Sequence, residues 1–300
     1  MRNKFADVFN DEAKQNSKLV MVVADISPAG SMMEFRDNYP ERFINVGVSE
    51  QIMIGIAAGL ALRGLRPFTY TIATFALYRP FEFVRDDLCY QNLPVTVVGM
   101  GAGVVYSTLG ATHHTMEDIS IATSIPNMTV VAPCDPLEAE AVTKWCARDS
   151  QGPVYLRLGK AGEPNFTQDA VDTYVFGKMR YICRGEDVCI LTYGPVGIKL
   201  AFELKDDRMK DVSLSIVSCH TLKPFDTDGL KEIFQSHSRV IVIEEHVPRG
   251  GLSSRVKEFA WDNKVDCELQ CHTLKDEFIH FYGTHEDLLK EHGLAAEFIA

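Results

Sequence analysis

The sequence has no long uninterrupted apolar run. No segment approaches the roughly twenty apolar residues that a membrane-spanning helix needs. The N-terminal sequence MRNKFADVFNDEAK carries charges throughout and lacks the apolar stretch of a signal peptide. These two absences lead us to expect a cytoplasmic protein that does not act in a membrane.

Positive charge is scarce relative to negative charge. The 300 residues include 30 Lys and Arg against 41 Asp and Glu, which gives a formal net charge of -11. Such a surface disfavours nucleic acids and anionic membranes as partners. We therefore expect no nucleic-acid partner, and any phosphate site must be small and local.

A disulfide-type spacing of cysteines is also absent. The eight cysteines are scattered along the chain, as suits reduced thiols in a reducing compartment. Cys267 and Cys271, followed by His272, form the one pair that resembles part of a zinc motif. Because no second ligand pair accompanies them, we expect buried or idle thiols and no metal site in this chain.

Apolar runs and helical patterns alternate along the sequence. The apolar runs are continuous, which is typical of parallel strands covered on both faces. Residues 49–62, 136–148 and 195–205 have helical patterns, and Asp135 stands where a helix cap is expected. Strand and helix in repeated succession predict an α/β fold. The predicted strands lie in LVMVVAD, RPFTYTIAT, LPVTVVG, MTVVAP, VCILTYG, SLSIVS and RVIVIEE.

A polar stretch near the middle of the chain separates two sets of these units. It is rich in turn formers and weak in periodicity: GKAGEPNFTQDAVDTYV. We predict a first domain over residues 1–160, a linker over 161–175 and a second domain over 176–300. Each domain is expected to be a mainly parallel sheet flanked by helices.

Several motifs do not name a reaction by themselves. GMGAG at residues 99–103 lacks the third glycine of a dinucleotide fingerprint, because Val104 stands in its place. Glu50 begins a helix of small apolar residues, where an acid complements the helix dipole or shares a proton with a ligand.

The aromatic and histidine motifs likewise allow more than one interpretation. Phe75, Tyr78 and Phe81 have helical spacing, which most often marks a buried helix face. The adjacent His113 and His114 point in different directions, so they do not suit one metal ion. One of them in a cleft can donate a proton or a hydrogen bond.

Taken in order, these pieces resemble the transketolase family, in particular the part of transketolase and deoxyxylulose-phosphate synthase that binds the pyrimidine of thiamine diphosphate. The resemblance covers essentially the whole chain. It implies a thiamine-diphosphate pyrimidine-binding domain followed by a transketolase C-terminal domain. The matching segments are ADISPAG, RFINVGVSEQIMIGIAAGLALRGLRPF, TFALYRPFEF, QNLPVTVV, GATHH, IPNMTVVAPCDPLEA, GPVYLRLGK, EDVCILTYGP, LKPFDTDGL, VIVIEEHVPRGGLSS and HGLAAEFIA.

The resemblance gives Glu50, in GVSEQ, the role of cofactor activator. In the family, the thiazolium carbon loses a proton to the cofactor's own aminopyrimidine, once a glutamate hydrogen-bonds the opposite ring nitrogen. Phe75 matches the aromatic residue that stacks on the pyrimidine, with Tyr78 as the alternative. His113 matches the family's substrate-facing histidine.

Other residues are implied to contact the substrate. His114 occupies the position where many relatives carry glutamine. Lys160, in LRLGK, matches an arginine that grips the sugar phosphate, and Arg157 is placed to assist it. Leu109 stands where relatives often carry an aspartate associated with a substrate hydroxyl. The usual sugar recognition therefore does not follow, and the donor and acceptor stay open.

One part of such an enzyme is missing from the sequence. The family holds the diphosphate through Mg²⁺ with a Gly-Asp-Gly motif, and no Gly-Asp-Gly occurs here. The resemblance implies a separate N-terminal transketolase subunit that carries this motif. That partner subunit would provide most of the contacts to Mg²⁺. Self-association of the present chain would complete a heterotetramer, active only with its partner.

Three other functions stay open. They are the beta subunit of a 2-oxo-acid dehydrogenase, a deoxyxylulose-phosphate-synthase-like enzyme, and a non-catalytic relative that only binds a partner. GATHH, IPNM and LKPFDTDGL favour a transketolase, which transfers a two-carbon ketol unit from a ketose or ketose phosphate to an aldose.

Overall fold

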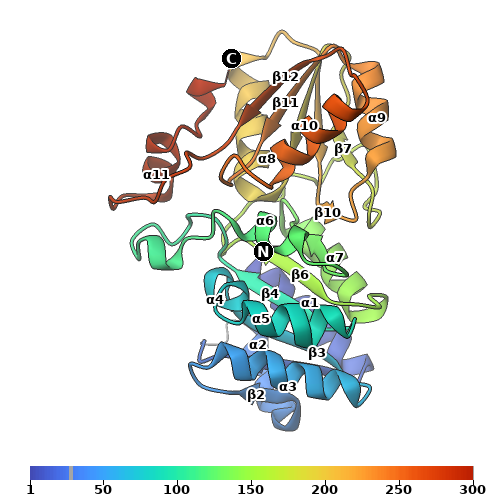
Figure 1. Ribbon diagram of the computed structural model, residues 1–300, viewed down its shortest axis with the longest axis vertical. Coiled ribbons are helices and arrows are strands. Elements are labelled where there is room, and N and C mark those ends of the chain that lie inside the picture. Colours follow the sequence, from blue (N-terminus) through green and yellow to red (C-terminus); the bar gives the residue numbers. More distant parts are fainter. Residues whose placement is uncertain (27–29, 300) are drawn as a thin grey trace.

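The computed structural model describes residues 1–26 and 30–299. Residues 27–29, within the ADISPAG segment, and residue 300, at the end of HGLAAEFIA, lie outside the described residues. The chain forms two sheets with helices on their faces, one above the other in Figure 1. The predicted α/β fold with two mainly parallel sheets is confirmed.

The first sheet has seven strands in the order β10-β5-β6-β4-β3-β1-β2. Neighbouring strands run parallel, except that β10 pairs antiparallel with β5. The strands are β1 (Leu19–Val23), β2 (Phe43–Asn45), β3 (Arg66–Ile72), β4 (Thr96–Met100), β5 (Thr129–Val131), β6 (Val154–Leu158) and β10 (Thr221–Lys223).

Helices cover both faces of this sheet. On β1, the side chains of Leu19, Met21 and Val23 join one apolar cluster, and those of Val20 and Val22 join another. This burial on two faces explains why the strand reads as a continuous apolar run. The helices are α1 (Arg2–Gln15), α2 (Ser31–Asn38), α3 (Glu50–Leu62), α4 (Ala73–Leu77), α5 (Phe81–Phe83), α6 (Asp118–Ser124) and α7 (Pro136–Arg148), with helical turns η1 (Pro40–Arg42), η2 (Val84–Tyr90) and η3 (Ala111–His113).

The second sheet has five strands in the order β12-β11-β8-β9-β7, with only β7 antiparallel to its neighbour. Its strands are β7 (Arg180–Cys183), β8 (Val188–Thr192), β9 (Leu214–Ser218), β11 (Arg239–Ile243) and β12 (Glu268–His272). Its helical elements are α8 (Gly194–Glu203), η4 (Leu204–Arg208), α9 (Thr227–Ser236), α10 (Leu252–Asp262), α11 (His285–Glu291) and η5 (Ala296–Phe298).

The start of α7 has the side-chain cap that the sequence predicts, whereas the start of α3 has none. The Asp135 Oδ1 atom accepts a 2.9 Å hydrogen bond from the backbone N–H of Glu138, which confirms the predicted cap of α7. Ser49 precedes α3 without a side-chain capping bond. Glu50 is therefore the acidic residue that meets the positive end of the α3 dipole.

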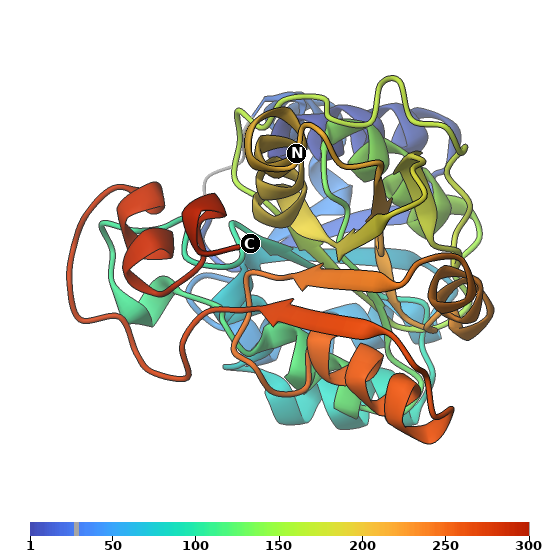
Figure 2. The ribbon, with the colours of Figure 1, turned by 90° about the horizontal axis from the view of Figure 1, so that it is seen from above.

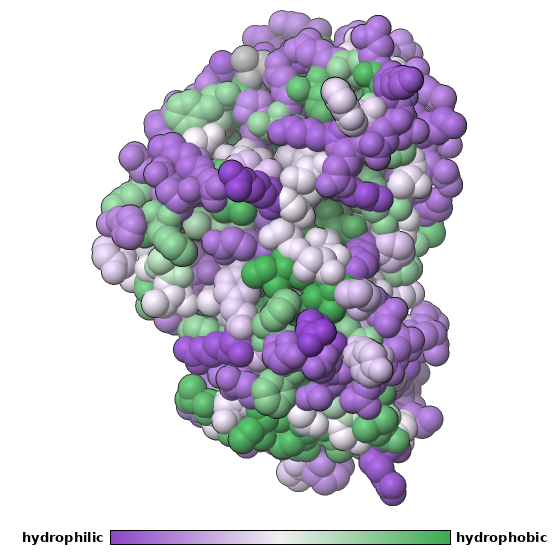
Figure 3. Space-filling model, in the orientation of Figure 1, coloured by the Kyte–Doolittle hydropathy of each residue, from purple (hydrophilic) through white to green (hydrophobic). Residues whose placement is uncertain are grey.

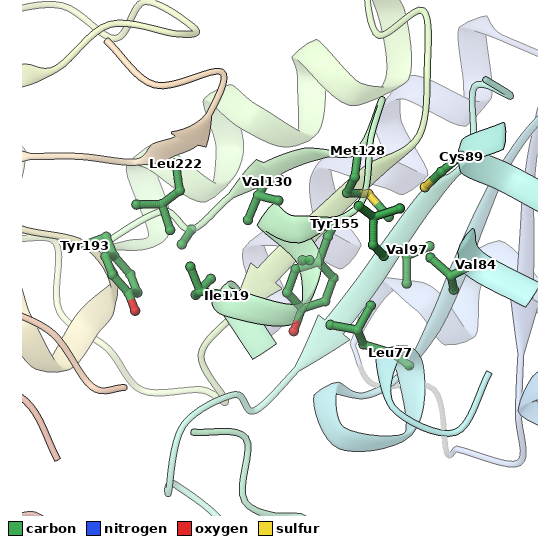
Figure 4. Close-up of a cluster of buried hydrophobic side chains, with 14 of the residues drawn as sticks. Leu77, Val84, Cys89, Val97, Ile119, Met128, Val130, Tyr155, Tyr193 and Leu222 are labelled. Carbon is green, nitrogen blue, oxygen red and sulfur yellow. The ribbon is translucent and has the colours of Figure 1, made fainter. Parts of the chain in front are cut away.

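The two halves of the chain share part of their apolar core. Figure 4 shows Ile119 and Tyr155 of the first half near Tyr193 and Leu222 of the second. All four belong to one cluster of buried side chains. Strand β10 strengthens this junction, because it follows β9 in the chain and yet pairs with β5 of the first sheet.

A buried polar network lies at the same junction. The Arg157 Nε atom donates a 2.9 Å hydrogen bond to Asp118 Oδ2, and Nη2 donates one of 3.2 Å to the carbonyl oxygen of Glu245. Burial opposes the guanidinium charge, but Asp118 together with Tyr193, Glu245 and Tyr155 outweighs it, and the pKa of Arg157 is raised. The Glu245 Oε1 atom accepts a 2.9 Å bond from the Val104 backbone N–H and lies 3.1 Å from His285 Nε2.

Gly103 lets the glycine-rich loop approach this network. Its φ angle is +75°, and a Cβ atom there would overlap the Glu245 carboxyl group. We expect Gly103→Ala to lower the free energy of unfolding by roughly 2–5 kcal/mol, from left-handed backbone strain and overpacking together. Gly177→Ala is the matched control, because φ is +79° and the space around it is open. Equal losses in chemical denaturation would contradict the close approach.

Asp118 should be needed to balance the buried charge of Arg157. Asp118→Asn leaves that charge without its counter-ion, and we expect it to lower the free energy of unfolding by about 3–5 kcal/mol. Glu82→Gln removes one of the two carboxylate partners of the exposed Arg85 and should change stability little. Denaturation of both variants tests this, and an Asp118→Asn protein as stable as the control would count against the network.

Candidate active site

The segments that follow β2, β3, β4 and β6 lie at one edge of the first sheet. These strands run parallel to β1 or to one another, so their carboxyl ends meet there. Glu50 begins α3 after β2, and Phe75 lies in α4 directly after β3. His113 lies in η3 after β4, and Lys160 follows β6. The fold thus gathers residues that are far apart in the sequence.

Glu50 and Phe75 are joined by Arg79, which the sequence analysis missed. The Arg79 Nη1 atom donates a 3.0 Å hydrogen bond to Glu50 Oε1. The Arg79 Cζ atom lies 3.9 Å from the centre of the Phe75 ring. Its position four residues after Phe75 is a helical spacing that could have found it, although Arg79 lies in the turn just after α4.

The same row continues from Phe75 to Lys160. The rings of Phe75 and His113 meet edge to face, with 5.1 Å between their centroids. Tyr106, also missed from the sequence, has its ring centroid 6.2 Å from that of His113. The Lys160 Nζ atom lies 5.0 Å from the centre of the Tyr106 ring. An acid, an aromatic face, an imidazole and an ammonium group therefore follow one another along the edge.

The Glu50 carboxylate is a buried acceptor beside a flat apolar surface. Only 4% of its side chain is exposed, whereas 45% of the Arg79 side chain is. A ring that presents an N–H to the carboxylate and its face to Phe75 fits this pair chemically. The aminopyrimidine of thiamine diphosphate is a group of that kind.

His113 is suited to proton exchange near neutral pH. Burial and the charge of Arg79 lower the pKa of its imidazole, so the ring is neutral at pH 7. A neutral imidazole offers one donor and one acceptor. The Thr112 Oγ1 atom lies 3.0 Å from the Nδ1 atom of His113 and helps to orient the ring.

Tyr78 and His114 lie outside the row. They line a cavity of about 260 Å³ together with Glu117 and Phe278. The Tyr78 hydroxyl donates a 2.9 Å hydrogen bond to Glu117 Oε2, and burial raises its pKa. Burial lowers the pKa of His114, which is almost fully enclosed. Of the two aromatic candidates, it is Phe75 whose face is turned toward the Arg79 guanidinium.

The buried position of Arg157 does not match the expectation that it assists Lys160 in binding a sugar phosphate. Its side chain is 3% exposed and is held by Asp118 and by the Glu245 carbonyl. Direct contact with a sugar phosphate does not fit this geometry. Lys160, three residues further on, lies beyond the end of β6 and is exposed.

An apolar rim borders the site. The loop after β4 and the segment before α11 lie side by side in Figure 2, and the Tyr282 hydroxyl oxygen would lie 3.3 Å from a Cβ atom at Gly110. Leu109, Phe278 and Tyr282 are exposed there. This rim presents apolar and aromatic surface at the position where an aspartate is common in the resembled family.

The described part of the chain is without a cluster of metal ligands and without a helix that could span a membrane. It contains no group of three or more His, Cys, Asp or Glu side chains that could hold a metal ion. Within residues 1–26 and 30–299, no helix is both long and apolar enough to cross a membrane.

The chain matches two known domain families. Transketolase, pyrimidine binding domain, matches residues 1–162, and Transketolase, C-terminal domain, matches residues 177–299. An apulose-4-phosphate transketolase subunit of Phocaeicola vulgatus is 30% identical, over 99% of this chain and 94% of its own length. The 1-deoxy-D-xylulose-5-phosphate synthase of Clostridium perfringens is 31% identical over 98% of this chain, but only 48% of the synthase is covered.

A solved structure agrees with these relatives. A split gene transketolase, described as an inactive beta4 tetramer, superimposes with a TM-score of 0.88 at 31% identity. The match covers 99% of this chain and 94% of that one. The resemblance seen in the sequence is confirmed. The chain belongs to the transketolase family and contains its pyrimidine-binding and C-terminal domains.

Proposed function

We propose that the chain is the cofactor-activating subunit of a cytoplasmic, thiamine-diphosphate-dependent transketolase. The reaction transfers a two-carbon ketol unit from a ketose or ketose phosphate donor to an aldose acceptor. The observation that carries this proposal is the buried Glu50 carboxylate at the start of α3, next to the aromatic face of Phe75.

Glu50 and Phe75 are the residues that would hold the pyrimidine ring. Thiamine diphosphate, when bound, supplies the carbon nucleophile that the reaction needs. Glu50 would hold a hydrogen bond to a pyrimidine nitrogen in a place where water competes little. Phe75 would orient the ring against Glu50 through its face.

His113 and Lys160 extend the same edge toward the substrate. His113, neutral at pH 7, exchanges a proton or a hydrogen bond with the oxygen atoms of the substrate. Lys160 attracts a phosphate as a point charge at the exposed end of the row. His114 contacts a substrate that reaches into the adjacent cavity. Arg157 does not contact the substrate in this proposal, but holds the buried junction between the two halves of the chain.

A separate N-terminal transketolase subunit completes the active site in this proposal. The sequence contains no Gly-Asp-Gly, so Mg²⁺ and the diphosphate are held mainly by that partner. The Phocaeicola relative, which is named as one subunit of a transketolase, supports a division of the enzyme between two chains. The matched ranges 1–162 and 177–299 support the division of this chain at residues 161–175.

Self-association is assigned to the outer face of α3. Ile52, Gly55, Gly59 and Leu62 recur at intervals of three and four residues and so share one side of the helix. Ile52 and Leu62 are exposed, and both glycines face open space, which lets another backbone approach closely. Figure 3 shows apolar surface over α3 near the lower end of the molecule. The tetrameric relative supports self-association as such, and the exposed apolar residues of α3 support its place.

Glu50→Gln tests the role of the carboxylate. It keeps the shape of the side chain and removes the charge that favours the reactive form of the pyrimidine. We expect turnover in the presence of the partner subunit to fall by at least about 100-fold, while the protein stays folded. Steady-state ketol transfer measures this, with Glu82→Gln as an exposed control. Near-normal turnover of Glu50→Gln would contradict the proposal.

Ile52→Glu tests the α3 interface. A charge at the centre of an apolar contact opposes its burial, so we expect the variant to have a lower mass in solution than the wild type. Light scattering coupled to gel filtration measures the mass. Val175→Glu, at an exposed apolar position remote from α3, should leave the mass unchanged. An unaltered assembly of Ile52→Glu would place the interface elsewhere.

A further inference from the structure

The Arg79 guanidinium is in contact with both residues that the proposed function assigns to the pyrimidine. It donates to Glu50 Oε1 at 3.0 Å and lies close enough to Phe75 to place Cζ 3.9 Å from the ring centre. A guanidinium is planar, donates in its own plane and stacks on aromatic faces. It therefore makes the same two kinds of contact that an aminopyrimidine would make.

Burial decides what a ligand must move to reach Glu50. Only 4% of the Glu50 side chain is exposed and Arg79 holds Oε1, so a ring that bonds Oε1 and lies on the Phe75 face must displace the guanidinium. Arg79 is the neighbour that can yield, because 45% of its side chain is exposed and it lies between α4 and α5. Asp118, by comparison, is paired with Arg157, which is itself buried and cannot turn toward water.

We propose that Arg79 is a gate on the pyrimidine site, occupying the Glu50 carboxylate and the Phe75 face until the ring of the cofactor displaces it. This inference rests on the proposed function, since it takes Glu50 and Phe75 as the pyrimidine contacts. The gate keeps the buried carboxylate paired with a cation until the ligand arrives, so that Glu50 is not left as an uncompensated charge. It also makes pyrimidine binding a competition within the chain.

The exchange is energetically accessible. The Arg79 side chain is half-exposed. Water can therefore also reach its contact with the Phe75 ring. Contacts of this kind are individually weak. Competition from them should therefore weaken pyrimidine binding by about five- to tenfold relative to a chain without the gate.

Titration calorimetry of thiamine diphosphate with Mg²⁺ into the purified chain tests the gate. We expect Arg79→Ala to lower the dissociation constant by about five- to tenfold, because the ligand no longer competes with the guanidinium. Arg79→Lys keeps the charge but not the planar stacking group, so its dissociation constant should lie between those of wild type and Arg79→Ala. Arg85→Ala removes an exposed arginine of the next helical turn, which pairs with Glu82, and should bind as the wild type does.

The imidazole of His113 gives a second readout that does not depend on the cofactor. Burial and, as a smaller cause, the charge of Arg79 lower the pKa of His113. Arg79→Ala should therefore raise that pKa toward its ordinary value in an NMR titration, and Arg85→Ala should not change it.

The outcomes separate the gate from the function on which it rests. An Arg79→Ala chain that binds thiamine diphosphate no more tightly than a wild type that does bind it would overturn the gate alone. Failure of wild type and Arg79→Ala alike to bind thiamine diphosphate, even with the partner subunit present, would overturn the proposed function and the gate together. Tighter binding confined to the Arg79 variants would support both.

Discussion

Parallel pairing of β2, β1, β3, β4 and β6 is the constraint on which the candidate site depends. It sends the segment after each strand to the same edge of the sheet, however far apart these segments are in the chain. Glu50, Phe75, His113 and Lys160 each follow a different one of these strands. Glu50, Phe75 and Lys160 therefore lie within a few residues of a strand end, whereas His113 is reached through the glycine-rich loop after β4.

Two buried carboxylates show how the same chemistry serves structure and function. Asp118 and its partner Arg157 are both buried, and their pairing holds the junction between the two halves. Glu50 is buried as well, but its partner Arg79 is half-exposed and stacks on an aromatic ring rather than being enclosed. A pair with one solvated member can exchange its partner for a ligand at small cost, whereas a fully enclosed pair cannot. The exposure of the cation separates Glu50, to which we assign a function, from the structural Asp118.

The sequence anticipated the parts of the fold whose signal is local. All seven predicted strands are present, because strands covered on both faces read as continuous apolar runs, and Asp135 caps α7 as its position indicates. Five strands lie outside the predicted runs: the short β2, β7 and β10, the partly exposed β12, and β6, whose apolar run is interrupted by Arg157. Their pairing is set by their neighbours in the folded chain rather than by their own composition.

The candidate site was anticipated to a similar extent. Glu50, Phe75, His113 and Lys160 could be named because family motifs carry them. Arg157 and Lys160 stand three residues apart in one motif, and only the packing of the second half over β6 shows that the first is enclosed and the second is not. Arg79 was missed because its role depends on a side chain reaching two residues at once, and the spacing to Phe75 accounts for only one of these contacts.

The central claim is that this chain supplies the pyrimidine half of an active site that it shares with a second subunit. Its most direct test is the rate of ketol transfer from a ketose phosphate to an aldose, with thiamine diphosphate and Mg²⁺, for the chain alone, for a partner carrying Gly-Asp-Gly alone, and for their mixture. Our account predicts activity only in the mixture, rising until the two chains are present in equal amounts. Robust ketol transfer by the chain alone would contradict it.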